Sequence, residues 1–340
     1  MRKGENLSKE NLISINDSNH RVIIPLYIPN EVSYYKDAYR IFEYCLFSVI
    51  KTSSTKLKVS VISNNSCDEV NERLFQLQKQ GYIDELIIEK EAVGKINSIL
   101  KALRTAQERL ITIADADVLF CNDWENAVVS VFEAFPKAGS VSPVPVFRTH
   151  FRLTSNIWLR YLFSSKLSFR PVKNPEALTR FANSIGWAWL DMKYKDVIGT
   201  LKAKNGTIAV LGCSHFVVTY KREVFDELPK GNSVFQLGGN SEHLYIDVPV
   251  IKMGGYRLAT YDNYAYHLGN HFEPWMEKDF NELYVTEKNN NDYDKLPILK
   301  KRIVMHYFSE KFFKKIFTFK KVKKFILKQK GLTSIQINNF

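Results

Sequence analysis

The segment RLITIADADVLF, residues 109–120, joins a strand pattern to a pair of carboxylates, and it decides how the rest of the chain is interpreted. Its first half is apolar and rich in β-branched residues, which favours a buried strand over residues 109–115. Asp115 and Asp117 follow at the carboxyl end of that strand. Two carboxylates at this spacing can share a divalent cation, although the same pattern also occurs in solvated turns, where Asp is favoured.

Three further strand patterns precede this segment, and helical patterns separate all four. Apolar, β-branched runs predict strands over residues 21–28, 57–63 and 85–89. Apolar positions gathered on one face predict helices over residues 34–50, 68–80 and 95–107. This alternation indicates an α/β fold with a mainly parallel central sheet flanked by helices. Ligands on such sheets bind at the carboxyl ends of the strands, which is where the aspartate pair lies.

The alternation weakens after Gly139. Residues 147–205 are rich in Arg, Phe and Trp without a clean period, and we interpret them as an insertion with helical pieces. Strand character returns over residues 207–222 and 256–260, with a helical stretch near 242–254. We therefore expect a polar N-terminal segment, a main domain, a polar linker and a C-terminal extension, over residues 1–20, 21–271, 272–297 and 298–340.

The C-terminal extension carries most of the net charge of +12. Residues 300–330 hold twelve Lys and Arg residues against one acid, Glu310, so the rest of the chain is close to neutral. Apolar side chains recur there at helical spacing, at Met305, Phe308, Phe312, Ile316, Phe319, Val322 and Ile326. A basic face opposite an apolar face is typical of a helix that lies on an anionic membrane surface. The alternative is that the apolar stripe packs on the main domain.

Composition excludes several classes of protein. A hydrophobic content of 45% does not fit a wholly disordered chain. Four widely separated cysteines without a C-x-x-C pair argue against a Cys-rich zinc site or a disulfide framework. The polar first residues and the lack of a run of about 18 apolar residues indicate neither a secretion signal nor a transmembrane helix. We expect a cytoplasmic protein, held peripherally on the inner face of the cell membrane.

A series of short motifs, in this order, resembles the family-2 glycosyltransferases with the GT-A fold. They are IPLY at 24–27, SNNSCD at 63–68, GKIN at 94–97, DAD at 115–117, GC at 212–213 with TYKREVFDEL at 219–228, SEH at 241–243 and YHLG at 266–269. The resemblance implies a GT-A-type domain, followed here by a helical C-terminal extension. It also implies transfer of a hexosyl group from a nucleotide-sugar donor, a UDP-sugar by first preference, to a hydroxyl of a carbohydrate or lipid-linked acceptor.

The resemblance further implies which residues bind the donor and a divalent cation. Asp117 and His267 would hold Mn²⁺ or Mg²⁺ against the donor diphosphate. His271 is the alternative to His267, and a histidine in this aromatic segment equally suits a structural role. The donor contacts are expected from Pro25, Tyr27, Asn64, Asn65, Asp68, Lys95, Asn97 and Asp115.

The chain departs from the family pattern at two positions. Ser63 replaces the usual first acid, and His243 stands where the family has its catalytic aspartate. Glu242, His243 or Asp247 is therefore expected to take the proton of the acceptor hydroxyl as general base, in a reaction that inverts the anomeric configuration. The expected role is synthesis of a surface polysaccharide or glycolipid.

Two other functions fit parts of the pattern. A sugar nucleotidyltransferase would share the sheet and the paired acids, but the first strand leads into Pro25 and Tyr27 and not into a Gly-rich phosphate loop. A nucleic-acid binder would use the basic extension, but the main domain is neutral and the extension is rich in phenylalanine. We therefore expect no nucleic-acid partner.

Overall fold

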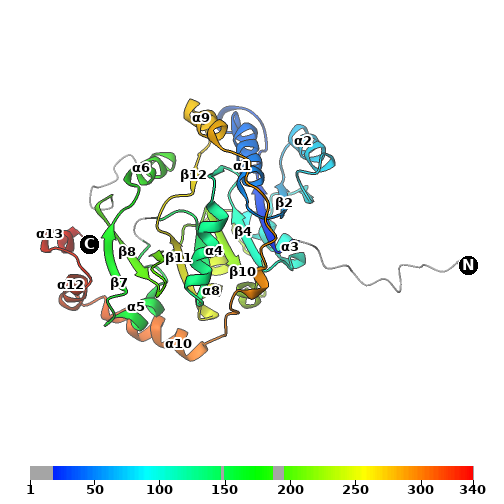
Figure 1. The fold of residues 1–340 in the computed structure, drawn as a ribbon. Coiled ribbons are helices and arrows are strands. Elements are labelled where there is room, and N and C mark those ends of the chain that lie inside the picture. The colour runs from blue at the N-terminus through cyan, green and yellow to red at the C-terminus, as the bar shows by residue number, and fades with distance from the viewer. Residues whose placement is uncertain (1–17, 147–148, 187–194, 340) are drawn as a thin grey trace, which may run out of the picture.

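The computed structural model describes residues 18–146, 149–186 and 195–339 (Figure 1). A 10-stranded sheet runs through the molecule in the order β3-β2-β1-β4-β10-β6-β11-β9-β8-β7. Apolar clusters lie on both faces of this sheet and helices cover them. Most of the predicted N-terminal segment and parts of the predicted insertion lie outside the described residues.

The first half of the sheet has the predicted strand–helix alternation. In chain order, its elements are β1 (His20–Leu26), α1 (Ala38–Thr52), β2 (Leu57–Asn64), α2 (Asp68–Lys79), β3 (Glu85–Glu89), α3 (Lys95–Thr105) and β4 (Leu110–Ala114). The four strands pair in parallel, so their carboxyl ends meet at one edge. Successive side chains of β1 point to opposite faces, with Ile24 in the cluster beside α1 and Ile23 in the cluster beside α3.

The second half of the sheet mixes strand directions. Its strands are β6 (Ala138–Ser142), β7 (Leu167–Pro171), β8 (Val197–Lys202), β9 (Ile208–Leu211), β10 (Val217–Lys221) and β11 (Tyr256–Thr260). Strands β7, β9 and β10 run against the other strands, so the sheet is mainly parallel, as predicted. A separate two-stranded sheet pairs β5 (Val118–Phe120) with β12 (Ala265–His267).

The strand character expected over residues 207–222 and the helical pieces expected over residues 147–205 are both present. Residues 207–222 form two strands, because Gly212 adopts a φ of 97° and turns the chain between β9 and β10. A Cβ at Gly212 would lie 2.4 Å from the Cβ of Thr149, so the turn accepts only glycine. The insertion contains strands β7 and β8 besides helices α5 (Ser155–Tyr161) and α6 (Pro175–Ser184), since its strands pair with each other at the sheet edge.

The helical stretch expected near residues 242–254 is present in two parts. A π-helical turn over His243–Asp247 leads into α8 (Val248–Lys252). Pro249 lies in the first turn of α8, where its missing N–H costs no helical hydrogen bond.

The predicted linker packs against the main domain. It contains α9 (Pro274–Glu282), and Tyr293 of the following segment is buried. The Tyr293 hydroxyl donates to Glu125 Oε1 at 3.0 Å. Glu125 lies at the start of α4 (Trp124–Ala134), is fully buried, and also contacts His20 Nδ1 at 2.6 Å and the Thr55 hydroxyl at 2.6 Å. Burial opposes ionisation here, but the hydrogen bonds and His20 outweigh it and lower the pKa of Glu125 to about 2.

The C-terminal extension is helical, as expected, but it is broken. A helical run over residues 303–316 comprises α10 (Ile303–Tyr307), a π-helical turn (Phe308–Phe313) and α11 (Lys314–Ile316), and α12 (Lys320–Gln329) and α13 (Ser334–Asn339) follow it. Figure 1 shows α12 and α13 beside the edge formed by β7 and β8. The Phe169 amide of β7 donates to the Lys330 carbonyl at 2.8 Å, which ties the extension to this edge. Within the described ranges, no helix combines the length and apolar character needed to cross a bilayer.

Candidate active site

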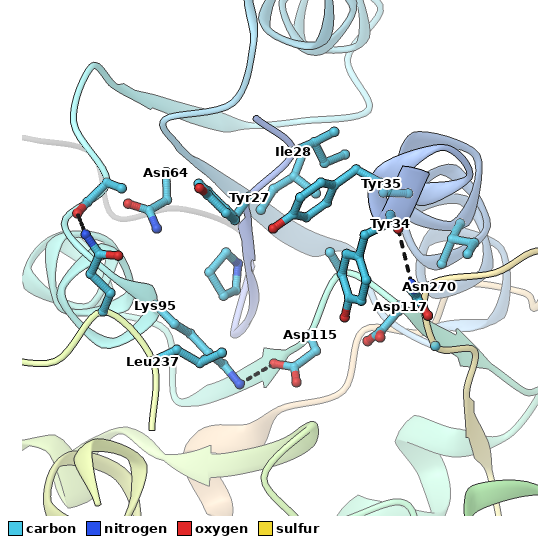
Figure 2. A pocket seen from close by; sticks show the side chains of 18 residues that line it. Tyr27, Ile28, Tyr34, Tyr35, Asn64, Lys95, Asp115, Asp117, Leu237 and Asn270 are labelled. Atoms are coloured by element: carbon cyan, nitrogen blue, oxygen red, sulfur yellow. Dashed lines mark hydrogen bonds and ion pairs between the residues drawn. The ribbon is translucent and has the colours of Figure 1, made fainter. Parts of the chain in front are cut away.

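A cleft of about 470 Å³ opens at the carboxyl ends of β1, β2 and β4 (Figure 2). This is the edge at which the predicted sheet was expected to bind its ligand. Of the residues predicted to contact the donor or the cation, the cleft is lined by Pro25, Tyr27, Asn64, Lys95, Asp115 and Asp117. The strand ends therefore bring together residues that are up to 92 positions apart in the sequence.

Lys95 links two carboxylates at this cleft. Its Nζ lies 2.6 Å from Asp115 Oδ1 and 2.6 Å from Glu242 Oε1. Burial lowers the pKa of Lys95, but the two carboxylates outweigh burial and raise it above its ordinary value. For Glu242 burial favours the neutral acid, yet Lys95 lowers the pKa of Glu242 on balance. Both groups are therefore charged at neutral pH.

Asp115 lies in a different electrostatic environment from Glu242. Burial, with the charge of Asp117 beside it, raises the pKa of Asp115 to about 6 although Lys95 opposes the shift. The Asp115 amide donates to the Phe216 carbonyl at 2.7 Å, so the residue is fixed between β4 and β10. The cleft thus holds a concentration of negative charge that suits a cation or the hydroxyls of a ligand.

Asp117 and His267 meet because β5 pairs with β12. His267 is opposite Val118, and the Leu268 amide donates to the Asp117 carbonyl at 2.7 Å. His267 Nε2 lies 3.3 Å from Asp117 Oδ2, and its Nδ1 lies 2.9 Å from the Ser184 hydroxyl. His271 instead pairs with Asp37 at 3.0 Å, and its side chain is 82% exposed.

The Asp117–His267 pair has the chemistry of a partial cation site. Asp117 Oδ1 is buried and accepts no hydrogen bond, which leaves one carboxylate oxygen available to a ligand. A carboxylate suits Mn²⁺ and Mg²⁺, whereas an imidazole is the more usual ligand of transition metals. In the described parts of the chain no group of three or more His, Cys, Asp or Glu side chains gathers around such a point.

The model for the family described as Glycosyl transferase family 2 matches residues 22–228 of the chain. The chain belongs to this family. The matched segment carries β1 to β4, the aspartate pair and Lys95, whereas Glu242, His243, Asp247 and His267 lie beyond its end. No curated protein matches the chain.

Two solved structures resemble this family member at low identity. One is the mannosyltransferase PcManGT from Pyrobaculum calidifontis in complex with GDP-Man and Mn²⁺, with 22% identity and a TM-score of 0.41. The other is TarS 1-349 of S. aureus in complex with UDP, with 12% identity and a TM-score of 0.40. The alignments cover 72% and 73% of this chain, but only 55% and 60% of the two solved chains.

Three predicted donor contacts of the family member lie outside the cleft lining. The Asn97 side chain donates to the Ser233 carbonyl at 2.9 Å and accepts from the Ser233 amide at 2.9 Å, so it ties α3 to the loop at 229–241. Asp68 is exposed in the first turn of α2. Asn65 adopts a φ of 62° in the turn after β2.

The loop at 229–241 packs on the start of α3. The Lys95 amide donates to the Gln236 carbonyl at 3.0 Å, and Gln236 and Leu237 line the cleft. Gly94 has a φ of 91°, and a Cβ there would lie 2.6 Å from the Gln236 Cα. Only glycine at position 94 permits this approach, which accounts for the glycine that begins the GKIN motif.

Two tyrosines that sequence analysis did not select complete the aromatic side of the cleft. Tyr34 and Tyr35 lie in a short turn before α1, and Figure 2 shows them beside Tyr27. The Tyr27 and Tyr35 rings make an edge contact with centroids 5.8 Å apart. The pair of adjacent tyrosines close to the IPLY motif was the available signal.

A second cluster surrounds Asp247, and sequence analysis selected Asp247 and His243 for the site but not Arg257 or His215. Its Oδ1 lies 2.5 Å from Arg257 Nη2, and both side chains are only 1% exposed. Its Oδ2 lies 3.5 Å from His215 Nε2 and 4.0 Å from both His243 Nδ1 and Arg152 Nη2. His215 follows the Gly212–Cys213 motif, and its position after that glycine turn was the only signal in the sequence.

Proposed function

We propose that the protein is a glycosyltransferase that moves a sugar from a nucleotide-sugar donor to an acceptor hydroxyl. The observation that carries this proposal is the cleft in which Asp115, Asp117 and Lys95 converge at the strand ends of a family-2 domain. Its volume of about 470 Å³ suits a nucleotide-sized ligand.

The donor binds along the cleft in this proposal. Tyr27 and Tyr35 offer an aromatic wall for the nucleotide base, and Asn64 lies between them and α3. Asp115 accepts hydrogen bonds from ribose hydroxyls, while Lys95 adds positive charge near the phosphates. A UDP-sugar is the first donor to test.

Asp117 and His267 are the residues that would hold Mn²⁺ or Mg²⁺. The free Asp117 oxygen and the imidazole 3.3 Å from its carboxylate are the observations that support this assignment. When bound, the metal would stabilise the negative charge that develops on the diphosphate as it leaves. Ser184 fixes the His267 ring through Nδ1, so that Nε2 faces Asp117.

The transfer inverts the anomeric configuration in this proposal. The acceptor oxygen forms a bond to the anomeric carbon from the face opposite the diphosphate, whose bond to that carbon breaks. The acceptor proton passes to a base among Glu242, His243 and Asp247, of which Glu242 contacts the cleft residue Lys95. A carbohydrate or lipid-linked acceptor would fit a role in surface polysaccharide or glycolipid synthesis.

The C-terminal extension is the proposed contact with an anionic membrane. Phe313, Ile326 and Leu327 are buried against the main domain, which uses part of the apolar surface. The predicted stripe remains largely exposed at Met305, Phe308, Phe312, Phe319 and Val322. Exposed lysines flank it, and each lysine near an anionic leaflet contributes about 1 kcal/mol of binding.

Incubation of the full chain with a panel of nucleotide sugars and candidate acceptors, followed by mass spectrometry, tests the activity. Calorimetry with UDP should show binding that Mn²⁺ strengthens and EDTA weakens. The Asp117→Ala variant should lose both the metal effect and turnover while keeping its unfolding temperature. Metal-independent turnover at the wild-type rate in Asp117→Ala would remove the cation from the mechanism.

Liposome sedimentation tests the membrane contact. The full chain should bind anionic liposomes at low salt and ignore neutral ones, and Lys314→Glu with Lys315→Glu should weaken that binding. Lys278→Glu with Lys295→Glu is the matched control, because it reverses the charge of two exposed lysines outside the extension. Equal binding by all three proteins would exclude the extension as the contact.

A further inference from the structure

A second cavity, of about 600 Å³, opens between the ends of α4 and α5 and the turn after β8. It shares no lining residue with the cleft described above. Two of its residues, Lys137 and Tyr256, lie at the amino ends of β6 and β11. Because β6 and β11 run in the same direction as β4, these two residues lie at the opposite edge of the sheet from the cleft. The cavity is therefore separate from the site proposed for the donor.

This cavity is strongly basic, although the chain outside residues 300–330 is close to neutral. Its lining has one carboxylate, Glu133, and five cationic side chains, which are Lys137, Arg160, Lys166, Lys202 and Lys204. Among the residues that the structure describes, no carboxylate forms an ion pair with any of the five. Burial lowers the pKa of Lys137, and the charges of Arg160 and Arg302 act in the same direction. The cavity thus concentrates positive charge that its own surroundings do not neutralise.

A fully exposed aromatic side chain lies next to this cavity. Phe163 is 99% exposed, and it lies in the chain between the lining residues Tyr161 and Lys166. Its loop is nevertheless held in place, because Lys330 Nζ donates to the Tyr161 carbonyl at 3.0 Å and to the Ser164 carbonyl at 2.8 Å. Lys330 belongs to the C-terminal extension and is itself buried. The extension therefore fixes the loop that presents Phe163 to solvent.

The extension adds more exposed apolar side chains beside the cavity. α5, which carries Arg160, packs against the π-helical turn Phe308–Phe313, and Figure 1 shows α5 and α10 close together. Arg302, whose charge also lowers the pKa of Lys137, directly precedes α10. The exposed apolar residues that follow it are Val304, Met305, Tyr307, Phe308 and Phe312. Cationic and exposed apolar side chains are thus neighbours on this part of the molecule.

This combination fits a phospholipid headgroup better than a soluble anion. Phosphate oxygens form charge-assisted hydrogen bonds with lysine and arginine, and exposed apolar side chains next to them can enter the acyl layer. A soluble phosphate or a nucleic acid would neutralise the cations but leave Phe163 in water. Basic pockets at a membrane surface bind headgroups that carry several phosphate charges, and five cations suit such a headgroup better than a single diester.

We infer that this cavity binds the headgroup of an anionic phospholipid that carries two phosphate groups. The assignment rests on the membrane contact of the proposed function, and it adds selective recognition of one class of lipid to a general attraction of lysines. The five cations surround the phosphates in this arrangement, while Phe163 and the exposed apolar side chains of α10 enter the acyl layer.

Vesicle sedimentation at equal surface charge tests this inference. Cardiolipin carries two phosphates on one headgroup, whereas phosphatidylglycerol carries one. Phosphatidylcholine vesicles that contain cardiolipin are compared with vesicles that contain twice as much phosphatidylglycerol, so that both present the same number of phosphates. The full chain should bind the cardiolipin vesicles about 10-fold more tightly, a factor that corresponds to the contribution of one to two lysines.

A double variant removes the selectivity. Lys202→Gln with Lys204→Gln neutralises two exposed cations of the cavity, and this variant should bind the two kinds of vesicle about equally. Lys278→Gln with Lys295→Gln is the matched control, since it neutralises two exposed lysines elsewhere, and it should keep the preference of the wild type. Both variants should unfold close to the temperature of the wild type, because all four lysines are exposed.

Phe163→Ser tests the apolar part of the contact. This variant should bind both kinds of vesicle about 10-fold more weakly, as expected when one inserted aromatic side chain is lost. Phe75→Ser is the matched control, because it removes an exposed phenylalanine from α2, and its binding should equal that of the wild type. Unchanged vesicle binding by Phe163→Ser would contradict the proposed orientation on the membrane.

The outcomes separate this inference from the membrane contact on which it rests. If the wild type binds neither kind of anionic vesicle, the membrane contact fails. If it binds both kinds equally, the contact stands and the headgroup assignment is wrong. If Lys202→Gln with Lys204→Gln keeps the preference for cardiolipin, the lipid binds outside this cavity.

A lipid-free arm covers the other sources of phosphate. Inorganic phosphate or a single-stranded RNA oligonucleotide is added to the full chain without vesicles, and the unfolding temperature is measured. Neither should raise the unfolding temperature of the wild type above that of Lys202→Gln with Lys204→Gln. A rise confined to the wild type, together with equal binding to the two kinds of vesicle, would assign the cavity to a soluble phosphate or to a nucleic acid and overturn the lipid assignment.

Discussion

Replacement of Lys95 by methionine should destabilise the protein measurably, because it leaves Asp115 and Glu242 facing each other without a cation. At 2.6 Å and an effective dielectric constant of about 20, each ion pair contributes about 6 kcal/mol of Coulomb energy before desolvation is subtracted. Loss of one partner of a fully buried pair costs about 3–5 kcal/mol. Each carboxylate here keeps 27% of its side chain exposed, so water replaces part of the loss.

We therefore expect Lys95→Met to lower the free energy of unfolding by about 2 kcal/mol, below the range for fully buried pairs because the carboxylates are partly exposed. In a chain of this size, that corresponds to a fall in Tm of about 4 °C. Urea unfolding followed by circular dichroism measures the change directly. Calorimetry with UDP should show weaker binding, since the same substitution removes positive charge from the cleft.

Lys101→Met is the matched control on the same helix. Lys101 pairs with Glu89, but its own side chain is 48% exposed, against 15% for Lys95. Its loss should cost about 1 kcal/mol, less than the loss of Lys95, because water replaces the exposed ammonium and the buried Glu89 carboxylate keeps its hydrogen bond from the Ser98 hydroxyl. Equal free energies of unfolding in the two variants would refute the argument that Lys95 neutralises the cleft.

Three further changes have expected outcomes. Glu125→Gln should remove a pH-dependent contribution to the free energy of unfolding. With a folded-state pKa of about 2, Glu125 stabilises the fold fully above about pH 5. Between pH 5 and pH 2, urea titrations should therefore show the free energy of unfolding of the wild type falling by about 3 kcal/mol more than that of the variant. Tyr27→Ala should weaken UDP binding in calorimetry by about 5- to 10-fold, as expected for one aromatic contact, and unchanged affinity would exclude Tyr27 from the base site. Gly94→Ala should lower Tm and loosen the loop at Gln236, so proteolysis at residues 229–241 should become faster than in the wild type.

Local patterns predicted the first half of the sheet because each βαβ unit is stabilised by neighbours in sequence. β1 to β4 and the three helices between them begin and end within a few residues of the expected bounds, and the aspartate pair lies at the expected strand end. The placement of β10 between β4 and β6 was not predictable in this way. It depends on the glycine turn at Gly212 and on pairing with strands about 80 to 110 residues earlier.

The residues of the site likewise divide into those predicted by local motifs and those brought together only by the packing of distant segments. Lys95 and Asp115 follow directly from motifs near strand ends, and both line the cleft. Asn97 shares a motif with Lys95, but a helix turns successive side chains by about 100°, so Asn97 faces the loop at Ser233 instead. His215 carries no motif of its own, because its relation to Asp247 arises only when β10 and the π-helical turn pack together.

Lys95 pairs with Asp115, which is close in sequence, and with Glu242, which is far from it. This separation determines when the site forms during synthesis. Lys95 and Asp115 leave the ribosome early, whereas Glu242 follows Lys95 by 147 residues. At a synthesis rate of about 5–20 residues per second, Lys95 is made about 7–30 seconds before its partner carboxylate, Glu242. His267 emerges later still. A nascent chain that already holds the whole segment matched by the family, residues 22–228, therefore still lacks Glu242 and His267, and stalled or truncated translation products would carry an incomplete site.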